Sequence, residues 1–248
     1  MSSIHPSAHI GTGTVLGHHV VIEADVHVGP NCQIGHHVIL RSGTRIGASV
    51  RVDDGASIGK QPMRAANSAV TTDERLPGAE IGDHCIVGTN VVLYAGCTLA
   101  DRVLVADGAT VREHVTIGER TIVGRGVAIE NKCTIGRRCK LETNAYITAY
   151  SVLEDFVFIA PGVRTSNDNF VGRTEERFKH FKGVTVRRGA RIGVGAITLP
   201  GITIGEDALI AAGALVTRDA EPGMIHVGIP AKPVRPVPPE QRLDAQNW

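Results

Sequence analysis

Aromatic side chains are scarce in this chain of 248 residues, which contains one tryptophan, three tyrosines and five phenylalanines. A core packed mainly by aromatic rings is therefore excluded, and aliphatic side chains must supply most of the buried surface. An excess of charge is also lacking, because the net charge is +1. Without a basic tail or a charged block, we expect neither nucleic acid nor an anionic membrane as a partner.

Long apolar runs are absent as well. No stretch approaches the length that spans a bilayer, and residues 1–11 lack a basic segment followed by an apolar one. We therefore expect a cytoplasmic protein without a membrane anchor.

A six-residue repeat runs through residues 81–159, where an aliphatic side chain occupies every sixth position. These positions are Ile81, Val87, Leu93, Leu99, Val105, Val111, Ile117, Val123, Ile129, Ile135, Leu141, Ile147, Leu153 and Ile159. The period is neither that of a helix nor that of a simple strand. A fixed short repeat of this kind is typical of a solenoid, here a parallel β-helix.

A second inward position supports the repeat, because only small or β-branched residues stand four places after each aliphatic. All five cysteines of the chain occupy this position, namely Cys32, Cys85, Cys97, Cys133 and Cys139. We expect them to be buried, reduced thiols, and expect neither a disulfide framework nor a zinc site. Glycine often follows the aliphatic residue, as at Gly82, Gly88, Gly118, Gly124 and Gly136, where we expect turns with positive φ.

The same register fills most of the chain. It runs from Ile4 to Ile58, slips across residues 59–80, breaks again across 165–185, and resumes from Val186 to Val216 with Thr198 as an imperfect inward residue. Proline-rich sequence from Pro222 to Pro239 is predicted to end the solenoid. The predicted fold is all-β: a β-helix of about ten coils over residues 1–230, with external loops at 59–80 and 165–185 and a tail at 231–248.

This pattern resembles the hexapeptide-repeat acyltransferase superfamily, and the resemblance covers nearly the whole chain. It implies a left-handed parallel β-helix in which three hexapeptides form one coil, so that residues 18 apart stack at roughly 4.8 Å. It also implies a homotrimer with active sites in the clefts between adjacent subunits.

The C-terminal coils resemble those of CoA-dependent acetyltransferases in three segments: Leu199–Gly205, Ala211–Ala214 and Val227–Lys232. The resemblance implies acetyl-CoA as co-substrate. Small residues are expected along its pantetheine arm, and cations near its phosphates. The candidate cofactor-binding residues are Gly162, Ala212, Gly213, Arg188, Arg191, Arg218 and Lys232.

On the acceptor side, the chain resembles nucleotide-sugar N-acetyltransferases. The similarity runs through Leu141–Asn144, Leu153–Gly162 and Asn167–Asp168, although the family's Pro-Arg appears here as Gly172-Arg173. It implies a nucleotide-linked amino sugar as the second substrate and an active site containing Asn144 and Asn167. The candidate substrate-binding residues are Glu142, Tyr146, Tyr150, Asn169 and Arg173.

Stacking at 18-residue intervals adds two columns. Gly126 and Gly162 would bracket Asn144, which either leaves room for a ligand or reflects two ordinary turn glycines. If the coils continue without a bulge, a second column contains His114, Lys132, Tyr150 and Asp168.

Acetyl transfer to an amine requires a group that orients the amine and accepts its proton. Asp168 or Asn167 is the first candidate for this role, and His114 is the reserve base. Backbone N–H groups at Ala160–Gly162 or Ala212–Gly213 are the candidates for holding the oxyanion. No serine or cysteine has the setting of an activated nucleophile, so we expect direct transfer within a ternary complex.

Three alternatives stay open. The segment Ala56–Gly59, followed by a loop and Glu80–Asp83, resembles the UDP-N-acetylglucosamine acyltransferases, although their long helical C-terminal domain has no counterpart. Histidines 18 residues apart, His9/His27, His18/His36 and His19/His37, suggest a metal-dependent carbonic anhydrase-like lyase. A non-catalytic scaffold is the third alternative. We favour the acetyltransferase and expect no metal.

Overall fold

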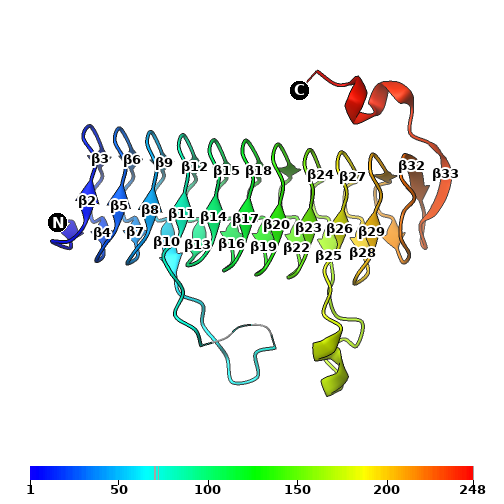
Figure 1. The fold of residues 1–248 in the computed structure, drawn as a ribbon, viewed down its shortest axis with the longest axis horizontal. Coiled ribbons are helices and arrows are strands. Elements are labelled where there is room, and N and C mark those ends of the chain that lie inside the picture. The colour runs from blue at the N-terminus through cyan, green and yellow to red at the C-terminus, as the bar shows by residue number, and fades with distance from the viewer. Residues whose placement is uncertain (70, 72, 248) are drawn as a thin grey trace. The chain divides into compact units, whose positions relative to one another are not determined.

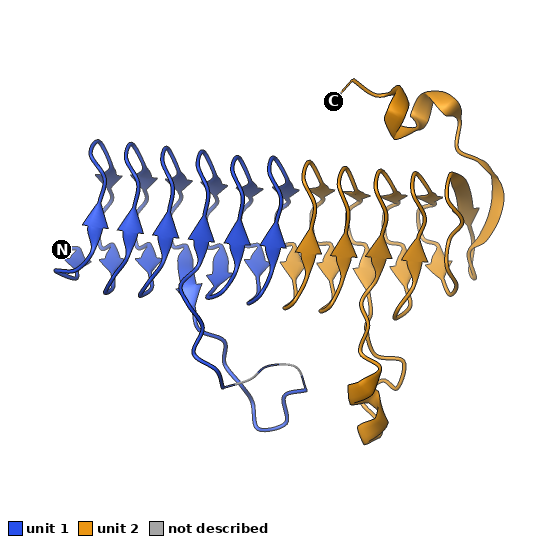
Figure 2. Ribbon diagram, viewed as in Figure 1, with its two compact units in different colours: residues 1–126 blue, residues 127–248 orange. Residues whose placement is uncertain are grey.

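The structure is a computed structural model that describes residues 1–69, 71 and 73–247. Its regular structure consists almost entirely of short β-strands joined by turns, and residues 1–126 and 127–248 form two compact units (Figures 1 and 2). Residues 70 and 72 of the first predicted loop and residue 248 of the predicted tail lie outside the described residues.

The N-terminal unit contains three parallel sheets, and successive strands of the chain enter sheets A, B and C in turn. Sheet A contains β1 (Ser3–Ile4), β4 (Val21–Ile22), β7 (Ile39–Leu40), β10 (Ser57–Lys60), β13 (Val92–Tyr94) and β16 (Thr110–Val111). Sheet B contains β2 (His9–Ile10), β5 (His27–Val28), β8 (Arg45–Ile46), β11 (Glu80–Ile81), β14 (Thr98–Leu99) and β17 (Thr116–Ile117). Sheet C contains β3 (Val15–Leu16), β6 (Gln33–Ile34), β9 (Arg51–Val52), β12 (Ile86–Val87), β15 (Leu104–Val105) and β18 (Ile122–Val123).

The C-terminal unit repeats this arrangement. Its sheet A strands are β19 (Ala128–Ile129), β22 (Tyr146–Ile147), β25 (Arg164–Thr165), β28 (Ile197–Thr198) and β31 (Leu215–Val216). Its sheet B strands are β20 (Thr134–Ile135), β23 (Val152–Leu153), β26 (Thr185–Val186) and β29 (Thr203–Ile204). Its sheet C strands are β21 (Lys140–Leu141), β24 (Phe158–Ile159), β27 (Arg191–Ile192), β30 (Leu209–Ile210), β32 (Met224–Val227) and β33 (Lys232–Pro236). Three short 3₁₀ helices complete the unit: η1 (Glu175–Lys179), η2 (Pro239–Gln241) and η3 (Leu243–Ala245).

Each coil contains one strand of each sheet, except the last, where a single bridge between Ala220 and Ile204 replaces the sheet B strand. The two units thus contain six and five coils, against the predicted total of about ten. Within each uninterrupted stretch, paired residues are 18 apart, as for Ile4 with Ile22 and Leu141 with Ile159. The predicted parallel β-helix with three hexapeptides in each coil is therefore confirmed.

The core is a column of inward side chains, and the register predicted from the sequence holds throughout 81–159. Ile147 and Leu153 are fully buried, as are the small residues Cys133 and Cys139. Burial of each large aliphatic side chain contributes about 1.5–3 kcal/mol. In the first coil the inward residue Ile4 remains 45% exposed, because no coil covers its N-terminal side.

Glycine is required after the aliphatic residues for close packing between coils, and not for positive φ as predicted. Gly82, Gly88 and Gly136 do not have positive φ. They lie against the next coil instead: a Cβ on Gly82 would come within 2.8 Å of backbone atoms of Ala100 and Asp101. Positive φ occurs at the second residue of most turns between the strands, which is often not glycine, as at Asn90 and Arg102.

Two insertions interrupt the coils, each in a turn that joins sheet A to sheet B within its own unit. The first occupies residues 61–79, because β10 continues to Lys60, and the second occupies residues 166–184. Leu76 fixes the first insertion, since it is buried and exchanges two hydrogen bonds with the Gln61 side chain, of 2.8 and 3.0 Å.

The coils end within the proline-rich segment, as predicted, although the chain stays in sheet C for one more strand. Strand β32 pairs in parallel with β30, and β33 then pairs with β32 in the antiparallel direction. Proline lacks an N–H donor but is tolerated in an edge strand, which explains why Pro233 and Pro236 can belong to β33. The chain then turns back through η2 and η3 (Figure 1).

Candidate functional site

Four residues of the C-terminal unit form a column in the turns that join sheet C to sheet A. Asn144, Gly162, Gly195 and Gly213 occupy the second position of successive turns, with φ between 60° and 69°. Backbone hydrogen bonds link the turns: Gly162 donates to the carbonyl of Thr143 at 3.0 Å, Gly195 to Pro161 at 3.0 Å, and Gly213 to Val194 at 2.8 Å. We call Gly162, Gly195 and Gly213 the glycine corner.

The glycine corner is open on its outer side. A Cβ added to any of the three glycines would meet no atom within 4 Å. A Cβ on Gly189, in a turn between sheets B and C, would instead come within 2.7 Å of Asp207 and 3.1 Å of Leu243. A thin ligand can therefore lie directly against the backbone of the glycine corner.

The segment Val227–Lys232 continues this corner. Leu215 donates its N–H to the carbonyl of Gly228 at 3.1 Å and accepts the N–H of Ala231 at 2.8 Å, which fixes residues 228–231 at the next turn. Lys232 and Arg218 line one pocket of about 340 Å³ with His226. Two predicted phosphate-binding cations thus lie together at the C-terminal end of the solenoid.

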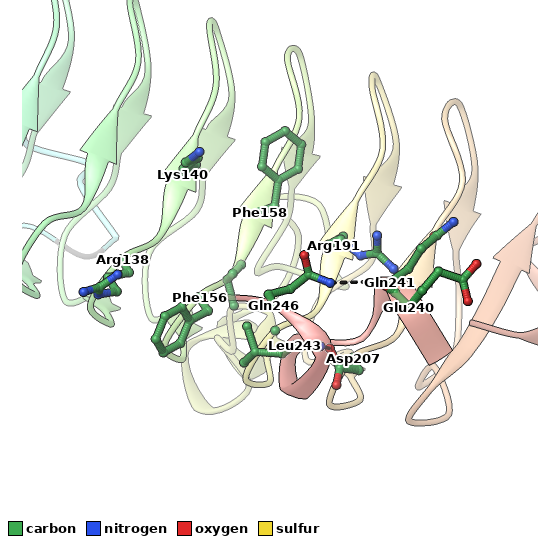
Figure 3. A pocket seen from close by; sticks show the side chains of 12 residues that line it. Arg138, Lys140, Phe156, Phe158, Arg191, Asp207, Glu240, Gln241, Leu243 and Gln246 are labelled. Carbon is green, nitrogen blue, oxygen red and sulfur yellow. Dashed lines mark hydrogen bonds between the residues drawn. The ribbon is translucent and has the colours of Figure 1, made fainter. Parts of the chain in front are cut away.

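The other two predicted cations lie elsewhere. Arg188 is in a turn between sheets B and C, with its Nη1 3.4 Å from Oε1 of Glu206. Arg191 is on the outer side of sheet C, in a cavity below the C-terminal tail (Figure 3). The structure therefore separates Arg188 and Arg191 from Arg218 and Lys232.

The backbone donors predicted for an oxyanion are mostly occupied. Ala160 donates to the carbonyl of Ile192 at 2.9 Å, Pro161 has no N–H, and Gly162 and Gly213 donate along the column. Only the Ala212 N–H has no acceptor among the described residues. Of the predicted donors, Ala212 alone is available.

Asn144 and its neighbours form one group of candidate residues. Asn144 is exposed, and Glu142 and Tyr146 flank it on the same turn and on the start of β22. The predicted neighbour Gly162 does lie one coil away, whereas Gly126 belongs to the N-terminal unit.

The remaining acceptor-side residues form a second group at the turns between sheets A and B. Tyr150 lies in such a turn, with Nζ of Lys132 5.4 Å from its ring centroid. Asn167, Asp168, Asn169 and Arg173 belong to the insertion that leaves the coil one turn later. Because the chain leaves the coil at Ser166, Asp168 does not stack on Tyr150; Gly183 packs against the Tyr150 backbone instead.

Asp168 shapes the insertion. Its Oδ1 accepts the N–H of Phe170 at 2.8 Å, its Oδ2 accepts the N–H of Gly172 at 3.0 Å, and Nε of Arg177 lies 3.3 Å from Oδ2. Desolvation tends to raise the pKa of Asp168, but these two N–H groups and Arg177 outweigh it and hold the pKa below its usual value. A carboxylate of this kind is a weak base, so the geometry favours orientation over proton acceptance.

His114 belongs to the N-terminal unit, where it is exposed in the turn between β16 and β17. Its N–H donates to the carbonyl of Gly96 at 3.2 Å, and its φ is 57°. Among the described residues, no side chain forms a hydrogen bond or ion pair with the imidazole that would orient it for proton transfer.

Gly195 is the residue that sequence reasoning missed. Counting by 18 from Gly162 leads into the insertion, so Gly195 falls outside the predicted column. Counting three residues from each inward aliphatic would have found it, because Gly162, Gly195 and Gly213 follow Ile159, Ile192 and Ile210.

The predicted histidine pairs are stacked. The ring centroids are 4.9 Å apart for His9/His27, 5.2 Å for His18/His36 and 5.0 Å for His19/His37. Within the described parts of the chain, no group of three or more His, Cys, Asp or Glu residues is arranged to hold a metal ion. In those same parts, no helix has the length and apolar character needed to cross a membrane.

Family models match more than half of the chain. Residues 19–54, 78–113 and 114–149 match a model described as bacterial transferase hexapeptide (six repeats), and residues 183–218 match a model described as hexapeptide repeat of succinyl-transferase.

Individual relatives share shorter segments. A chloramphenicol acetyltransferase of Agrobacterium fabrum is 54% identical over 44 residues, 18% of this chain and 21% of that protein. The galactoside O-acetyltransferase of Escherichia coli is 31% identical over 86 residues, 34% of this chain and 42% of that protein. This chain spans less than half the length of the curated relatives that it matches.

Among solved structures, a UDP-N-acetylglucosamine acyltransferase from Bacteroides fragilis aligns with a TM-score of 0.48 and 19% identity. The alignment covers 95% of this chain and 73% of that structure.

Proposed function

This chain belongs to the hexapeptide-repeat acyltransferase superfamily, and from that premise we propose that it transfers an acetyl group from acetyl-CoA to the amine of a nucleotide-linked amino sugar. The observation that carries the proposal is the glycine corner. It provides an open strip of backbone that begins beside Asn144 and continues to residues 228–232.

Acetyl-CoA fits this strip as a substrate. The distance from Asn144 to Gly213 is three coils, or roughly 14 Å at the usual inter-strand spacing. An extended, thin arm such as pantetheine can lie along glycines that leave no side chain in its path. Lys232 and Arg218 then provide positive charge for phosphates at the far end of the strip.

In the proposed reaction, the amine nitrogen attacks the thioester carbonyl carbon. The C–N bond forms, the C–S bond breaks, and the departing thiolate takes up the proton that the amine loses, which gives free CoA thiol. Asn144 positions the amine at the end of the glycine corner, next to the thioester carbon that the amine attacks.

A covalent acyl-cysteine is unfavourable. All five cysteines are buried, and burial raises the pKa of Cys133 to about 12 and that of Cys85 to about 11. Such thiols stay protonated at neutral pH and are poor nucleophiles. Direct transfer in a ternary complex is therefore part of the proposal.

We propose a homotrimer because Asn144 and Asn167 lie at different corners of the coil. One chain presents Asn144 in a turn from sheet C to sheet A, and the insertion with Asn167 leaves between sheets A and B. In a closed threefold arrangement the insertion of one subunit can face the glycine corner of the next.

A thiol-release assay tests the function. Purified protein is mixed with acetyl-CoA and a panel of UDP- and dTDP-linked amino sugars, and the product is checked by mass spectrometry for a base-stable amide. The buried cysteines should give no background signal. We expect release with one amino sugar, and loss of that release in Asn144→Ala while binding of CoA persists.

Two results would contradict the proposal. The first is the absence of both CoA-dependent thermal stabilisation and thiol release. The second is a marked preference for thioesters of acyl carrier protein over acetyl-CoA, which would favour the sugar acyltransferase alternative.

A further inference from the structure

A cavity of about 280 Å³ lies between sheet C of the C-terminal unit and the returning tail (Figure 3). One wall is formed by the outer face of sheet C and the adjoining turns, including Arg138, Phe158 and Arg191. The opposite wall is the tail from Glu240 to Gln246. The cavity lies at the turns between sheets B and C, whereas the glycine corner is formed by turns between sheets C and A, so the proposed transfer reaction does not use it.

The tail is fixed in place over this cavity. Leu243 is only 7% exposed, and its N–H donates to Oδ1 of Asp207 at 3.0 Å. A Cβ added to Gly189 would lie 3.1 Å from the Cβ of Leu243, so the tail packs closely on this glycine. Farther along, Nε2 of Gln246 donates to the carbonyl of Glu240 at 2.8 Å, which closes the tail on itself (Figure 3). The cavity therefore has a defined roof.

Arg191 has an unusual environment inside the cavity. Its Nε and Nη2 atoms are buried and have no hydrogen-bond partner among the described residues. Burial lowers the pKa of Arg191 and raises that of Asp207, and the latter already uses Oδ1 for the Leu243 N–H. Buried guanidinium donors without acceptors are costly. The third nitrogen, Nη1, is not among these buried atoms, so it is the Arg191 donor that an anion in the cavity can reach.

Further cations and aromatic rings surround Arg191. The guanidinium carbon of Arg138 lies 5.9 Å from the ring centroid of Phe156, and Arg138 makes no ion pair among the described residues. Lys140 adds a third cation to the lining, and Phe158 provides a second ring on the same face (Figure 3). The acids of the lining are Asp207 and Glu240.

We propose that this cavity binds a nucleoside phosphate. The guanidinium groups of Arg191 and Arg138 match the geometry of phosphate oxygens, and a flat base can lie against the ring of Phe158. The volume is close to the lower end of small-molecule pockets, which suits a mononucleotide better than a longer ligand. The proposal stands independently of the acetyl-transfer function.

The test is a calorimetric titration of the full chain with AMP, UMP and inorganic phosphate at fixed ionic strength. We expect saturable binding of a mononucleotide at least about tenfold tighter than binding of inorganic phosphate. Arg191→Met should weaken nucleotide binding by about tenfold or more, while the melting temperature without ligand stays the same or rises, because an apolar side chain replaces an unpaired buried charge. A purely structural role for Arg191 would lower that melting temperature.

Two further variants sharpen the test. Phe158→Leu should weaken binding of nucleotides but not of inorganic phosphate. Arg187→Met is the matched control, because Arg187 pairs with Glu154 at 2.6 Å and does not line this cavity; it should bind nucleotides as the wild type does. A parallel titration with CoA separates this cavity from the proposed donor site: the affinity for CoA should be the same in Arg191→Met and in the wild type, and a loss of CoA affinity in Arg191→Met would overturn the assignment to a separate nucleotide.

The proposal is also overturned by any of three results: no saturable binding of either mononucleotide, equal affinity for inorganic phosphate and nucleotides, or unchanged nucleotide affinity in Arg191→Met.

Discussion

Oγ1 of Thr165 accepts the backbone N–H of Thr148 at 2.8 Å, at an inward position of sheet A where the neighbouring coil also carries a threonine, Thr198. The same hydroxyl donates to the carbonyl of Tyr146 at 3.2 Å, so Thr165 is satisfied although it is buried. Thr198 is its partner in the next coil and is fully buried, but its hydroxyl has no hydrogen-bond partner within the described part of the chain. The two threonines occupy equivalent positions, but the paired hydroxyl of Thr165 stabilises the fold, whereas the unpaired hydroxyl of Thr198 destabilises it.

Opposite effects on stability follow for two identical substitutions. Thr198→Val should stabilise the protein by about 1 kcal/mol, because it removes an unpaired buried hydroxyl and keeps the shape of the side chain. Thr165→Val should destabilise it by about 1–2 kcal/mol, because it leaves the Thr148 N–H unpaired. Thermal or denaturant unfolding of both variants measures the difference, and a loss of stability in both would contradict the assignment.

The glycine corner predicts a specific effect on the donor substrate. Gly195→Asn should raise the KM for acetyl-CoA by about tenfold or more with little change in the KM of the acceptor, because a side chain enters the open strip. Asparagine tolerates the left-handed backbone, as Asn144 does in the same column at φ 60°. The backbone cost of the substitution should therefore be small.

Gly108→Asn is the matched control for this experiment. Gly108 has φ 67°, and an added Cβ would likewise meet nothing within 4 Å, but it belongs to the N-terminal unit. Its KM for acetyl-CoA should remain that of the wild type. Equal increases in both variants would show that the effect comes from the backbone and not from the ligand.

The packing of the coils was predictable from the sequence because it depends on a local, repeated rule. Each aliphatic residue such as Ile147 has the same environment as its neighbours in the next coils, so spacing alone identifies it. Asp168 was placed in the wrong column and Gly195 was missed, because counting by 18 fails once the chain leaves the coil at Ser166. Both errors have one origin, the length of the insertion.

The cavity below the tail had no signal in the sequence. Its roof depends on the place where Leu243 packs, and the tail has no period that relates it to Gly189 or Asp207. The charges of Arg138 and Arg191 were visible, but an arginine on the outer face of a repeat is normally solvated. Arg138 and Arg191 line a common cavity because the folded tail covers this part of sheet C.

A site shared between subunits predicts that two inactive variants complement each other. Asn144→Ala damages one corner and Asn167→Ala damages the other, so each homotrimer should be inactive. If the two variants are unfolded and refolded together in equal amounts, about one quarter of the sites should combine an intact Asn144 with an intact Asn167 from different subunits. Activity measurements on the mixture check this, and refolding each variant alone is the control; a mixture that stays inactive would contradict a shared site.

The stacked histidines of the N-terminal unit predict a pH-dependent stability. The rings of His19 and His37 have centroids 5.0 Å apart and planes inclined by 13°. The positive charge of the N-terminus, burial and the neighbouring histidines lower the pKa of His19 below its usual value of 6.5. The unfolded state then binds more protons than the folded state, so the free energy of unfolding should fall as the pH drops through 6.5.

Melting curves at pH 7.5 and at about pH 5.5 measure this dependence, since the histidine charge changes between these values. His19→Asn should reduce the difference between the two melting temperatures, because asparagine keeps the left-handed turn and carries no charge. His84→Asn is the control: His84 has the same φ of 58°, and no histidine stacks on it among the described residues. That control should retain the wild-type dependence, and an equal change in both variants would attribute the effect to histidine titration in general.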